Sequence, residues 1–267
     1  MSAIGAAFAR ARERRAPAFV AFVTAGDPTP ARTVGIALEL EQAGVDVLEL
    51  GVPFSDPIAD GPVIQRSSER ALAAGTDLRG VLGVVEAIRR RSALPLLLFS
   101  YLNPLLRYGV PALCRDARAA GVDGVLVTDL PPEEAEAWIP AAREGNLDTV
   151  FLAAPTSPEH RLREVAALSR GFVYAISRTG VTGARESLGD EAGPLVRRLR
   201  ALTGEPIALG FGISTPDAVA AAGEVADGVV VGSALVRYLE EHPQGDVGAH
   251  VRWLRSEVRP SDREVGR

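Results

Sequence analysis

The chain has 267 residues, of which 47% are hydrophobic and 24% charged, so it is long enough to bury a substantial core. Its formal net charge is −5 at pH 7, and no basic stripe or charge block runs along it, which argues against a nucleic-acid-binding protein. All 29 of its Lys+Arg residues are arginine, so the chain cannot form a lysine Schiff base with a carbonyl substrate or with pyridoxal phosphate.

The first 15 residues predict a short amphipathic helix. They lack the basic start and long apolar core of a signal peptide. Four arginines, at positions 10, 12, 14 and 15, lie in the second half of this segment. No uninterrupted apolar run in the chain reaches the ~20 residues that a membrane-spanning helix needs. We therefore expect a cytoplasmic protein with no membrane association.

Residues that form disulfides or zinc sites are scarce. The single cysteine, Cys114, excludes an intrachain disulfide, fits a reducing compartment and is expected to be a small buried side chain. Three scattered histidines, His160, His242 and His250, do not combine with it into a recognisable zinc site. We expect no metal in this chain.

Short apolar segments alternate with longer amphipathic segments along the whole chain, which predicts strands followed by helices. Eight strands are expected at residues 18–23, 45–50, 94–99, 124–127, 149–152, 172–176, 206–209 and 228–231. Helices are expected between them at residues 31–43, 78–91, 111–120, 133–143, 158–169, 191–202 and 216–222. Eight strand-helix units in about 250 residues are the proportion of a (β/α)8 TIM barrel.

The expected strands have the composition of parallel strands that are buried on both faces, because runs such as Val-Leu-Val show no alternation of apolar and polar residues. The sequence Ala-Gly-Val-Asp occurs at 43–46 and at 120–123, and in each copy glycine would end a helix just before a strand. A doubly wound open sheet is the main structural alternative. We expect one α/β TIM-barrel domain over residues 1–267, with a short N-terminal helix, extra helices and a flexible tail at 259–267.

Glu49 is the first candidate for catalysis. It lies near the end of the second expected strand, between Leu48 and Leu50, and catalytic groups of barrels lie at the carboxyl ends of strands. A glutamate there faces either the barrel interior or the helix layer. In the interior, desolvation would raise its pKa towards the working range of a proton donor.

The segment that follows, residues 51–62, carries three prolines, two glycines and two aspartates, which predicts a long structured loop over the barrel mouth. Asp56 and Asp60 are also ordinary turn residues. Two carboxylates in different environments at one mouth, Glu49 and Asp60, would allow one to shuttle a proton while the other stays ionised.

Small residues follow the last three expected strands and predict an anion site. They lie at 178–184, 210–214 and 232–234, where backbone N–H groups can point at a phosphate. Ser233 or Ala234 would begin a helix whose dipole favours negative charge. Three unrelated turns are the alternative interpretation.

The segment from Leu48 to Pro62, Leu-Glu-Leu-Gly-Val-Pro-Phe-Ser-Asp-Pro-Ile-Ala-Asp-Gly-Pro, closely resembles the signature of the tryptophan synthase alpha subunit family. Further motifs in family order are Phe22-Val-Thr-Ala-Gly-Asp-Pro28, Tyr101-Leu-Asn-Pro104, Gly124-Val-Leu-Val-Thr-Asp-Leu-Pro131, Ser177-Arg-Thr-Gly-Val-Thr-Gly183, Gly210-Phe-Gly-Ile-Ser214 and Val231-Gly-Ser233. The resemblance therefore covers most of the chain.

The resemblance implies a lyase that cleaves indole-3-glycerol phosphate to indole and glyceraldehyde 3-phosphate by a retro-aldol reaction, without a cofactor or metal in this chain. It implies that Glu49 is the proton shuttle. Asp60 would bind the indole N–H and stabilise the positive charge that develops there. The phosphate would be held by Gly183, Gly212, Gly232 and Ser233.

The resemblance also implies a substrate pocket and a partner. The pocket would be lined by Phe22, Tyr101, Leu126, Tyr174, Thr182 and Phe211, with Thr182 on a loop that closes over substrate and aligns Asp60. Pro53, Phe54 and Asp56 would meet a beta subunit that receives indole and carries pyridoxal phosphate, in an α2β2 heterotetramer.

Other functions stay open at this stage. The chain could be a stand-alone lyase that releases free indole, or a non-catalytic barrel that binds a phosphate ligand and regulates a partner enzyme. Another phosphate-binding barrel, such as an isomerase, is a further alternative. An indole-glycerol-phosphate synthase would call for a lysine acid, which the chain lacks.

Overall fold

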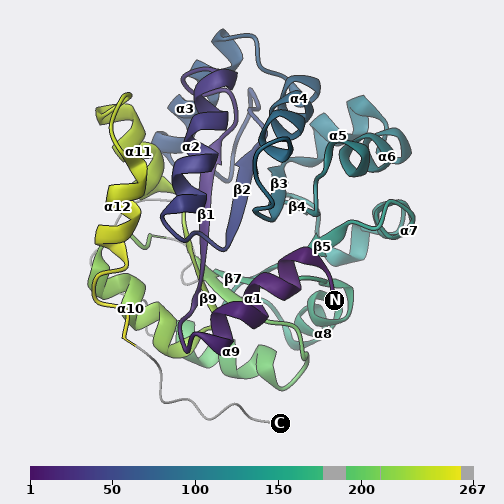
Figure 1. Cartoon of the computed structure of the whole chain (residues 1–267). Helices are drawn as coiled ribbons and strands as arrows, with labels where there is room; N and C mark the ends of the chain where they lie inside the picture. The colour runs from purple at the N-terminus through teal and green to yellow at the C-terminus, as the bar shows by residue number, and fades with distance from the viewer. Residues whose placement is uncertain (177–190, 211, 260–267) are drawn as a thin grey trace.

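A computed structural model describes residues 1–176, 191–210 and 212–259, and its core is a parallel sheet. The strands in these ranges are β1 (Ala18–Thr24), β2 (Val47–Gly51), β3 (Leu96–Ser100), β4 (Gly124–Val127), β5 (Asp148–Val150), β6 (Leu152–Ala153), β7 (Val173–Ile176), β8 (Ile207–Gly210) and β9 (Gly228–Val231). Their order in the sheet is β5-β4-β3-β2-β1-β9-β8-β7-β6. The helices lie around the outside of this sheet (Figure 1).

The sheet closes into a barrel through residues 148–153. β5 and β6 are consecutive parts of one extended segment, interrupted only at Phe151. The first part pairs with β4 and the second with β7, while the Phe151 carbonyl accepts the Tyr174 N–H at 3.1 Å. The nine strands therefore form the eight-stranded TIM barrel that the sequence predicts, and the open sheet is excluded.

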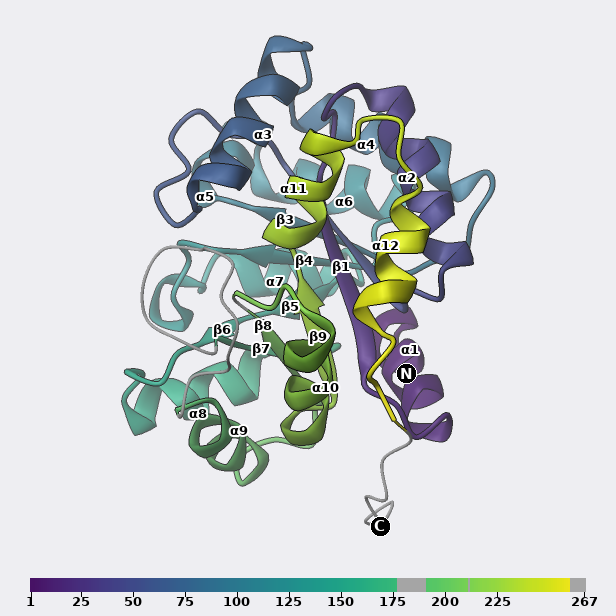
Figure 2. The ribbon, with the colours of Figure 1, turned by 90° about the vertical axis from the view of Figure 1, so that its left-hand side faces the viewer.

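The helices of the described ranges are α1 (Ala3–Glu13), α2 (Pro30–Gln42), α3 (Pro62–Ala73), α4 (Leu78–Arg89), α5 (Leu102–Tyr108), α6 (Val110–Ala120), the 3-10 turn η1 (Pro132–Glu134), α7 (Trp138–Glu144), α8 (Glu159–Leu168), α9 (Ala192–Arg200), α10 (Pro216–Val225), α11 (Ser233–Glu241) and α12 (Val247–Leu254). Figure 2 shows them from the side, with α3 and α11 next to each other. None of these helices is long and apolar enough to cross a membrane.

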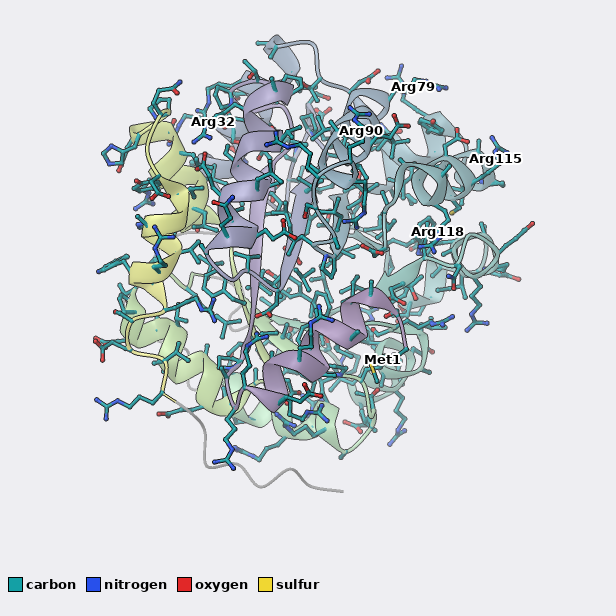
Figure 3. The ribbon with its side chains drawn as sticks, viewed as in Figure 1. Met1, Arg32, Arg79, Arg90, Arg115 and Arg118 are labelled. Atoms are coloured by element: carbon teal, nitrogen blue, oxygen red, sulfur yellow. The ribbon has the colours of Figure 1, made fainter. Side chains whose placement is uncertain are left out.

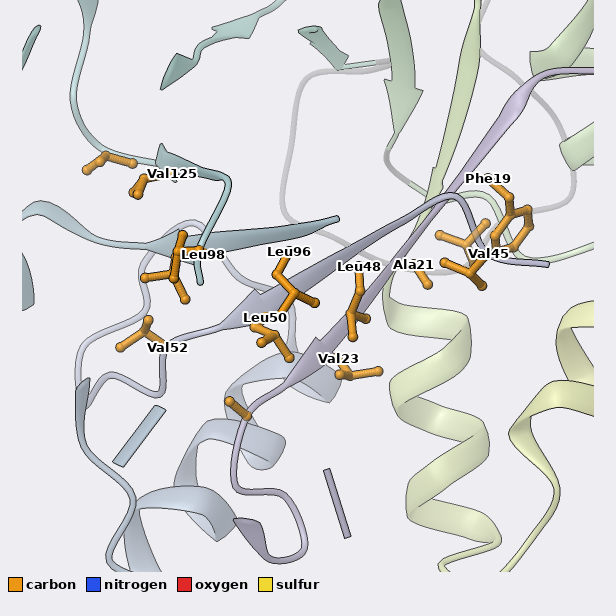
Figure 4. Packing of buried hydrophobic residues seen from close by; sticks show 14 of the residues in the cluster. Phe19, Ala21, Val23, Val45, Leu48, Leu50, Val52, Leu96, Leu98 and Val125 are labelled. Atoms are coloured by element: carbon orange, nitrogen blue, oxygen red, sulfur yellow. The ribbon is translucent and has the colours of Figure 1, made fainter. Parts of the chain in front are cut away.

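Side chains alternate between two apolar layers, as a pleated strand requires. Those that face the helices form the larger layer, and Figure 4 shows Leu48, Leu50, Leu96 and Leu98 in it. The intervening residues fill the barrel, where Val20, Val47, Leu97, Leu126, Val150, Phe172, Tyr174, Ala208 and Val230 form a second cluster. A residue between Leu48 and Leu50 must therefore point into the barrel.

Helix α1 covers the amino-terminal end of the barrel. Its apolar face, with Ile4 and Phe8, belongs to the interior cluster, and Phe8 packs on Phe172 with 5.3 Å between ring centroids. Ser2 caps the helix by accepting the Gly5 N–H at 3.1 Å. The predicted N-terminal helix is confirmed, and it leaves the carboxyl end of the barrel as the open mouth.

Three aspartates fasten this amino-terminal end. Asp46, Asp123 and Asp227 each accept a backbone N–H of a neighbouring strand at 2.9 Å. Each also binds an arginine of a nearby helix or turn: Arg14 for Asp46, Arg89 for Asp123 and Arg200 for Asp227. The last residue of the repeated Ala-Gly-Val-Asp sequence thus fixes the start of one strand against its neighbour.

One predicted helix, 133–143, is wrong in its boundaries. The chain forms the 3-10 turn η1 and then α7, with a break between Glu134 and Trp138. Pro140 explains the break, because it has no N–H for the residue four positions earlier and its ring would collide with that carbonyl. Pro140 is tolerated in the first turn of α7, where no such bond is made.

Two further expectations concern Cys114 and the C-terminal tail. The Cys114 side chain is buried, as predicted, and burial raises its pKa to about 11. Figure 3 shows Arg79, Arg90, Arg115 and Arg118 on the outer surface, and all four are exposed. Residues 260–267 of the expected tail lie outside the described residues, so that part stays a prediction.

Candidate active site

Glu49 lies inside the barrel on β2. Its register partners are Phe22 on β1 and Leu97 on β3, and its side chain belongs to the inner layer because Leu48 and Leu50 belong to the outer one. Only 1% of the residue is exposed. Of the two orientations that the sequence allows, the inward one is therefore correct.

Glu49 is a buried acid with little polar compensation. Its Oε1 has no hydrogen-bond partner among the described residues. Burial raises the pKa of Glu49 to about 8, because an ionised carboxylate loses its hydration there. The side chain therefore carries a proton at neutral pH and is able to donate it.

Asp60 lies at the end of the loop after β2, directly before the start of α3. Its N–H donates to the Pro57 carbonyl at 3.0 Å, and its own carbonyl accepts the side-chain amide of Gln65 at 2.9 Å. These bonds hold the end of the loop on the first turn of α3. Asp60 is buried, although the loop before it is largely exposed.

A tyrosine that directly follows β3 forms a hydrogen bond with Asp60. The Tyr101 hydroxyl donates to Asp60 Oδ2 at 3.0 Å and accepts the Ala59 N–H at 3.0 Å. Burial raises the pKa of Asp60 to about 6, while the bond from Tyr101 opposes that rise. At pH 7 Asp60 is therefore mostly ionised while Glu49 is mostly protonated.

Aromatic rings surround the two carboxyl groups. Phe22 packs edge-on against Phe99 at 5.1 Å, and Phe54 packs against Tyr101 at 5.2 Å. Tyr174 lies across the barrel, and its pKa is raised by burial and then by the charges of Glu49 and Asp60, so its phenol is near both. These rings offer flat apolar surfaces to a planar ligand.

Two glycines make room for these rings. A Cβ at Gly210 would lie 2.3 Å from the Tyr174 hydroxyl oxygen, and a Cβ at Gly51 would lie 2.6 Å from Phe22 Cζ. No side-chain atom fits at either distance. The aromatic wall therefore depends on glycine at these two strand ends.

The predicted phosphate residues that the structure describes lie at the same mouth. Gly232 precedes α11, and Ser233 is its first residue, where backbone N–H groups have no acceptor within the helix. Gly212 follows β8 with φ of +78°, a conformation that favours glycine. The start of α11 and the loop after β8 together offer an anion several backbone N–H groups and the positive end of a helix dipole.

The structure places some of the predicted site residues and does not describe others. Tyr174, Leu126 and Phe22 are buried in the clusters of the barrel interior and its mouth, and the buried Tyr101 contacts Asp60. Thr182, Gly183 and Phe211 lie outside the described residues. In the expected partner surface Pro53 is buried, Phe54 is half-buried and Asp56 is exposed.

The sequence analysis missed three residues next to the aromatic wall. Phe99 packs against Phe22, and Ile64 of α3 and Val236 of α11 belong to the same cluster. The order of the strands in the barrel could have indicated Phe99, since it lies in register with Gly51. The described residues contain no group of three or more His, Cys, Asp and Glu side chains that could hold a metal ion.

Comparisons with known proteins agree on one family. The family model described as tryptophan synthase alpha chain matches residues 8–259. The tryptophan synthase alpha chain of Solibacter usitatus is 54% identical over 91% of this chain and 91% of its own length, and that of Geobacter sulfurreducens is 48% identical over 97% and 98%.

Solved structures give the same result. A chain of Mycobacterium tuberculosis tryptophan synthase superposes with a TM-score of 0.90 at 40% identity, covering 97% of this chain and 98% of its own. A chain from the tryptophan synthase a2b2 complex of Pyrococcus furiosus superposes with a TM-score of 0.83 at 41% identity, covering 90% and 97%.

Proposed function

The chain belongs to the tryptophan synthase alpha chain family of lyases, and on that basis we propose that Glu49 and Asp60 carry its reaction. The reaction is the retro-aldol cleavage of indole-3-glycerol phosphate to indole and glyceraldehyde 3-phosphate. The observation that carries the proposal is one barrel mouth with two buried carboxyl groups whose pKa values, about 8 and about 6, lie on either side of neutrality.

Glu49 acts as the proton shuttle. Protonated at pH 7, it gives its proton to the indole carbon that bears the glycerol chain, and the ring becomes a cation. The resulting carboxylate takes the proton of the adjacent hydroxyl group. As that proton leaves, the aldehyde forms, the carbon-carbon bond breaks, and its electron pair restores the aromatic indole. Glu49 ends the cycle protonated.

Asp60 stabilises the cation. Because it is mostly ionised at pH 7, it accepts the indole N–H and attracts the positive charge that develops on that nitrogen. The hydrogen bond from Tyr101 supports this role by favouring the ionised form. The two carboxyl groups thus perform different tasks because their environments differ.

The rest of the site binds the two ends of the substrate. Gly212, Gly232 and Ser233, together with Gly183, hold the phosphate through backbone N–H groups and the dipole of α11. The indole ring lies among Phe22, Tyr101, Leu126, Tyr174 and Phe211, with Thr182 contributed by the segment after β7. The chain itself supplies acids and hydrogen-bond donors and uses no cofactor of its own.

A beta subunit is the partner, in an α2β2 assembly, and it carries the pyridoxal phosphate that this lysine-free chain could not anchor. Of the predicted contact residues Pro53, Phe54 and Asp56, the last two have side-chain surface to offer the partner, whereas Pro53 is buried. In support, Ile58 of the same loop is 79% exposed, which leaves a large apolar side chain beside Asp56 for a partner to cover. The loop joins the contact surface to Asp60.

The proposal is tested by indole release from Glu49→Gln and Asp60→Asn. We expect each variant to lose at least two orders of magnitude in kcat, as removal of an acid-base or charge-stabilising group does. Asp148→Asn is the matched control, because Asp148 is also a buried carboxyl with a raised pKa but lies at the opposite end of the barrel. Rates near that of the control in both site variants would rule out the mechanism.

A second assay separates an alpha subunit from a stand-alone lyase. Turnover is measured with and without the beta chain from the same cell. A subunit is expected to speed up on addition of the partner, whereas an unchanged rate with free indole as product would favour the stand-alone enzyme. Phosphate binding without turnover would indicate a regulatory barrel instead.

A further inference from the structure

Helices α3 and α11 each begin in one half of the proposed site. α3 starts two residues after Asp60, and α11 starts at the phosphate residues Gly232 and Ser233. The two helices lie side by side on the outside of the barrel (Figure 2). Their relative position therefore sets how Asp60 lies with respect to a bound phosphate.

The first connection between the two helices is apolar. Ile64 in the first turn of α3 and Val236 in the first turn of α11 belong to one buried cluster with Phe22. Apolar contacts of this kind are not directional, so they hold the helices together but permit them to turn about the point of contact. A second, directional connection is needed to fix the angle.

Two arginines of α3 provide directional connections. Arg66 binds Glu240 of α11 through Nε and Nη2, at 2.9 and 2.8 Å, and Arg70 binds both Glu240 and the loop after β1. From the far end of α3 the Nε and Nη2 of Arg70 donate to the two carboxylate oxygens of Asp27, at 2.8 and 2.7 Å. Its Nη1 donates to Glu240 of α11 at 2.9 Å. One guanidinium thus joins α3, α11 and the loop after β1, and its planar fork fixes the directions of all three bonds.

The loop that carries Asp27 is a fixed anchor. Gly26 has φ of +92°, donates its N–H to Thr33 at 2.9 Å, and lies so close to Thr76 that a Cβ would be 2.1 Å from Oγ1. Asp27 itself is 8% exposed and also accepts the Ser67 hydroxyl at 2.6 Å. Arg70 is therefore tied to a rigid part of the barrel rim.

We propose that Arg70 is a positioning residue that couples the phosphate-binding end of α11 to Asp60 by tying α11 and α3 together to the loop after β1. The inference rests on the proposed function of Asp60 and of the α11 start. Without Arg70, the Phe22 cluster, the exposed Arg66–Glu240 pair and the Ser67–Asp27 hydrogen bond still hold α3, but no single group joins α3, α11 and the loop after β1. Asp60 then gains freedom to move relative to the bound phosphate. The other arginine-aspartate pairs described above lie at the opposite end of the barrel and link no ligand-binding segments.

The test compares Arg70→Met with Arg200→Met in the full-length chain. Arg200 is the matched control because it also forms an ion pair of partial exposure, with Asp227 at 3.0 Å, away from the mouth. Both variants are expected to lose similar, small amounts of thermal stability. Only Arg70→Met is expected to lower kcat for indole release, on the order of tenfold.

The acid limb of the pH profile of kcat/KM provides a measurement that a mere loss of folding stability would not change. If Asp60 moves towards water in Arg70→Met, its pKa falls from about 6 towards its ordinary value, and the acid limb moves to lower pH. Arg70→Lys keeps the positive charge but lacks the planar fork that binds Asp27 and Glu240 together. We expect its kcat to lie between those of Arg70→Met and the parent chain. Equal kcat and equal acid limbs in Arg70→Met and Arg200→Met would overturn the inference.

Glu240→Gln covers the case in which Arg70→Met does not fold, because it weakens the bonds of both Arg66 and Arg70 to α11 and keeps Arg70 on Asp27. We expect a smaller loss of kcat, and an unchanged kcat would overturn the inference. If the unaltered chain releases no indole, the proposed function fails instead. In that case the inference is tested by calorimetric titration with inorganic phosphate. It predicts that Arg70→Met and Glu240→Gln bind phosphate more weakly than Arg200→Met does.

Discussion

The Tyr101 hydroxyl donates a hydrogen bond to Asp60 Oδ2 at 3.0 Å, and this bond links the end of β3 to the loop that follows β2. It opposes the effect of burial, which raises the pKa of Asp60 to about 6. A carboxylate that must stay charged is thereby kept ionised in a largely apolar mouth. The electrostatic role of Asp60 depends on its neighbour as well as on its own carboxyl group.

Tyr101→Phe tests this dependence. The variant keeps the ring but removes the donor, so the pKa of Asp60 is expected to rise above about 6. The loss of kcat/KM will then be larger at pH 6 than at pH 8, and the acid limb of its pH profile will move to higher pH. Steady-state indole release over this range is the measurement. An acid limb unchanged from that of the parent chain would contradict the assignment.

Glu49→Gln is expected to change the pH dependence of stability. The folded state holds the Glu49 proton up to about pH 8, whereas the unfolded state releases it near 4.5. Folding stability therefore falls as pH rises between these values, by roughly 3 kcal/mol at pH 7. Glutamine does not titrate, so the variant gains on the parent chain from pH 5 to pH 8.

Urea unfolding at pH 5 and at pH 8 measures that gain. A difference between variant and parent that stays constant over the range would show that Glu49 keeps an ordinary pKa in the folded chain. Asp148→Asn, which also removes a buried carboxyl with a raised pKa, shows whether such a trend occurs at the other end of the barrel.

Gly210→Ala is expected to disrupt the aromatic wall. The added Cβ would lie 2.3 Å from the Tyr174 hydroxyl oxygen, so the ring or the end of β8 must move. Overpacking of this kind costs about 1–3 kcal/mol of folding stability. We expect kcat/KM to fall further than the smaller fraction of folded protein alone would cause. Gly83→Ala in α4 is the control, because nothing lies within 4 Å of its added Cβ. Equal kcat/KM in the two variants would contradict the packing argument.

Much of the fold could be predicted because burial on both faces leaves a pattern in the sequence. The eight expected strands match the observed ones within about two residues, as is usual for boundaries drawn from a pattern. The prediction of one continuous helix at 133–143 was wrong because it took no account of the effect of Pro140 on the preceding turn. The split at Phe151 could not be predicted, since it arises from barrel closure between distant strands.

The site was harder to predict than the fold. Leu48 and Leu50 show that Glu49 lies on the face opposite to theirs, but they do not show which face is the interior until the whole barrel is formed. The contact between Tyr101 and Asp60 joins positions 41 residues apart and depends on loop geometry. The same is true of Arg70 and Glu240, which are 170 residues apart.

The pH profile of kcat/KM for indole release tests the central claim most directly. Glu49 must hold a proton and Asp60 must have lost one, so we predict a bell-shaped profile whose limbs lie near the pKa of Asp60, about 6, and that of Glu49, about 8. The basic limb belongs to Glu49 and the acid limb to Asp60. A rate that stays level or rises from pH 8 to pH 10 would contradict the assignment of Glu49 as the proton donor.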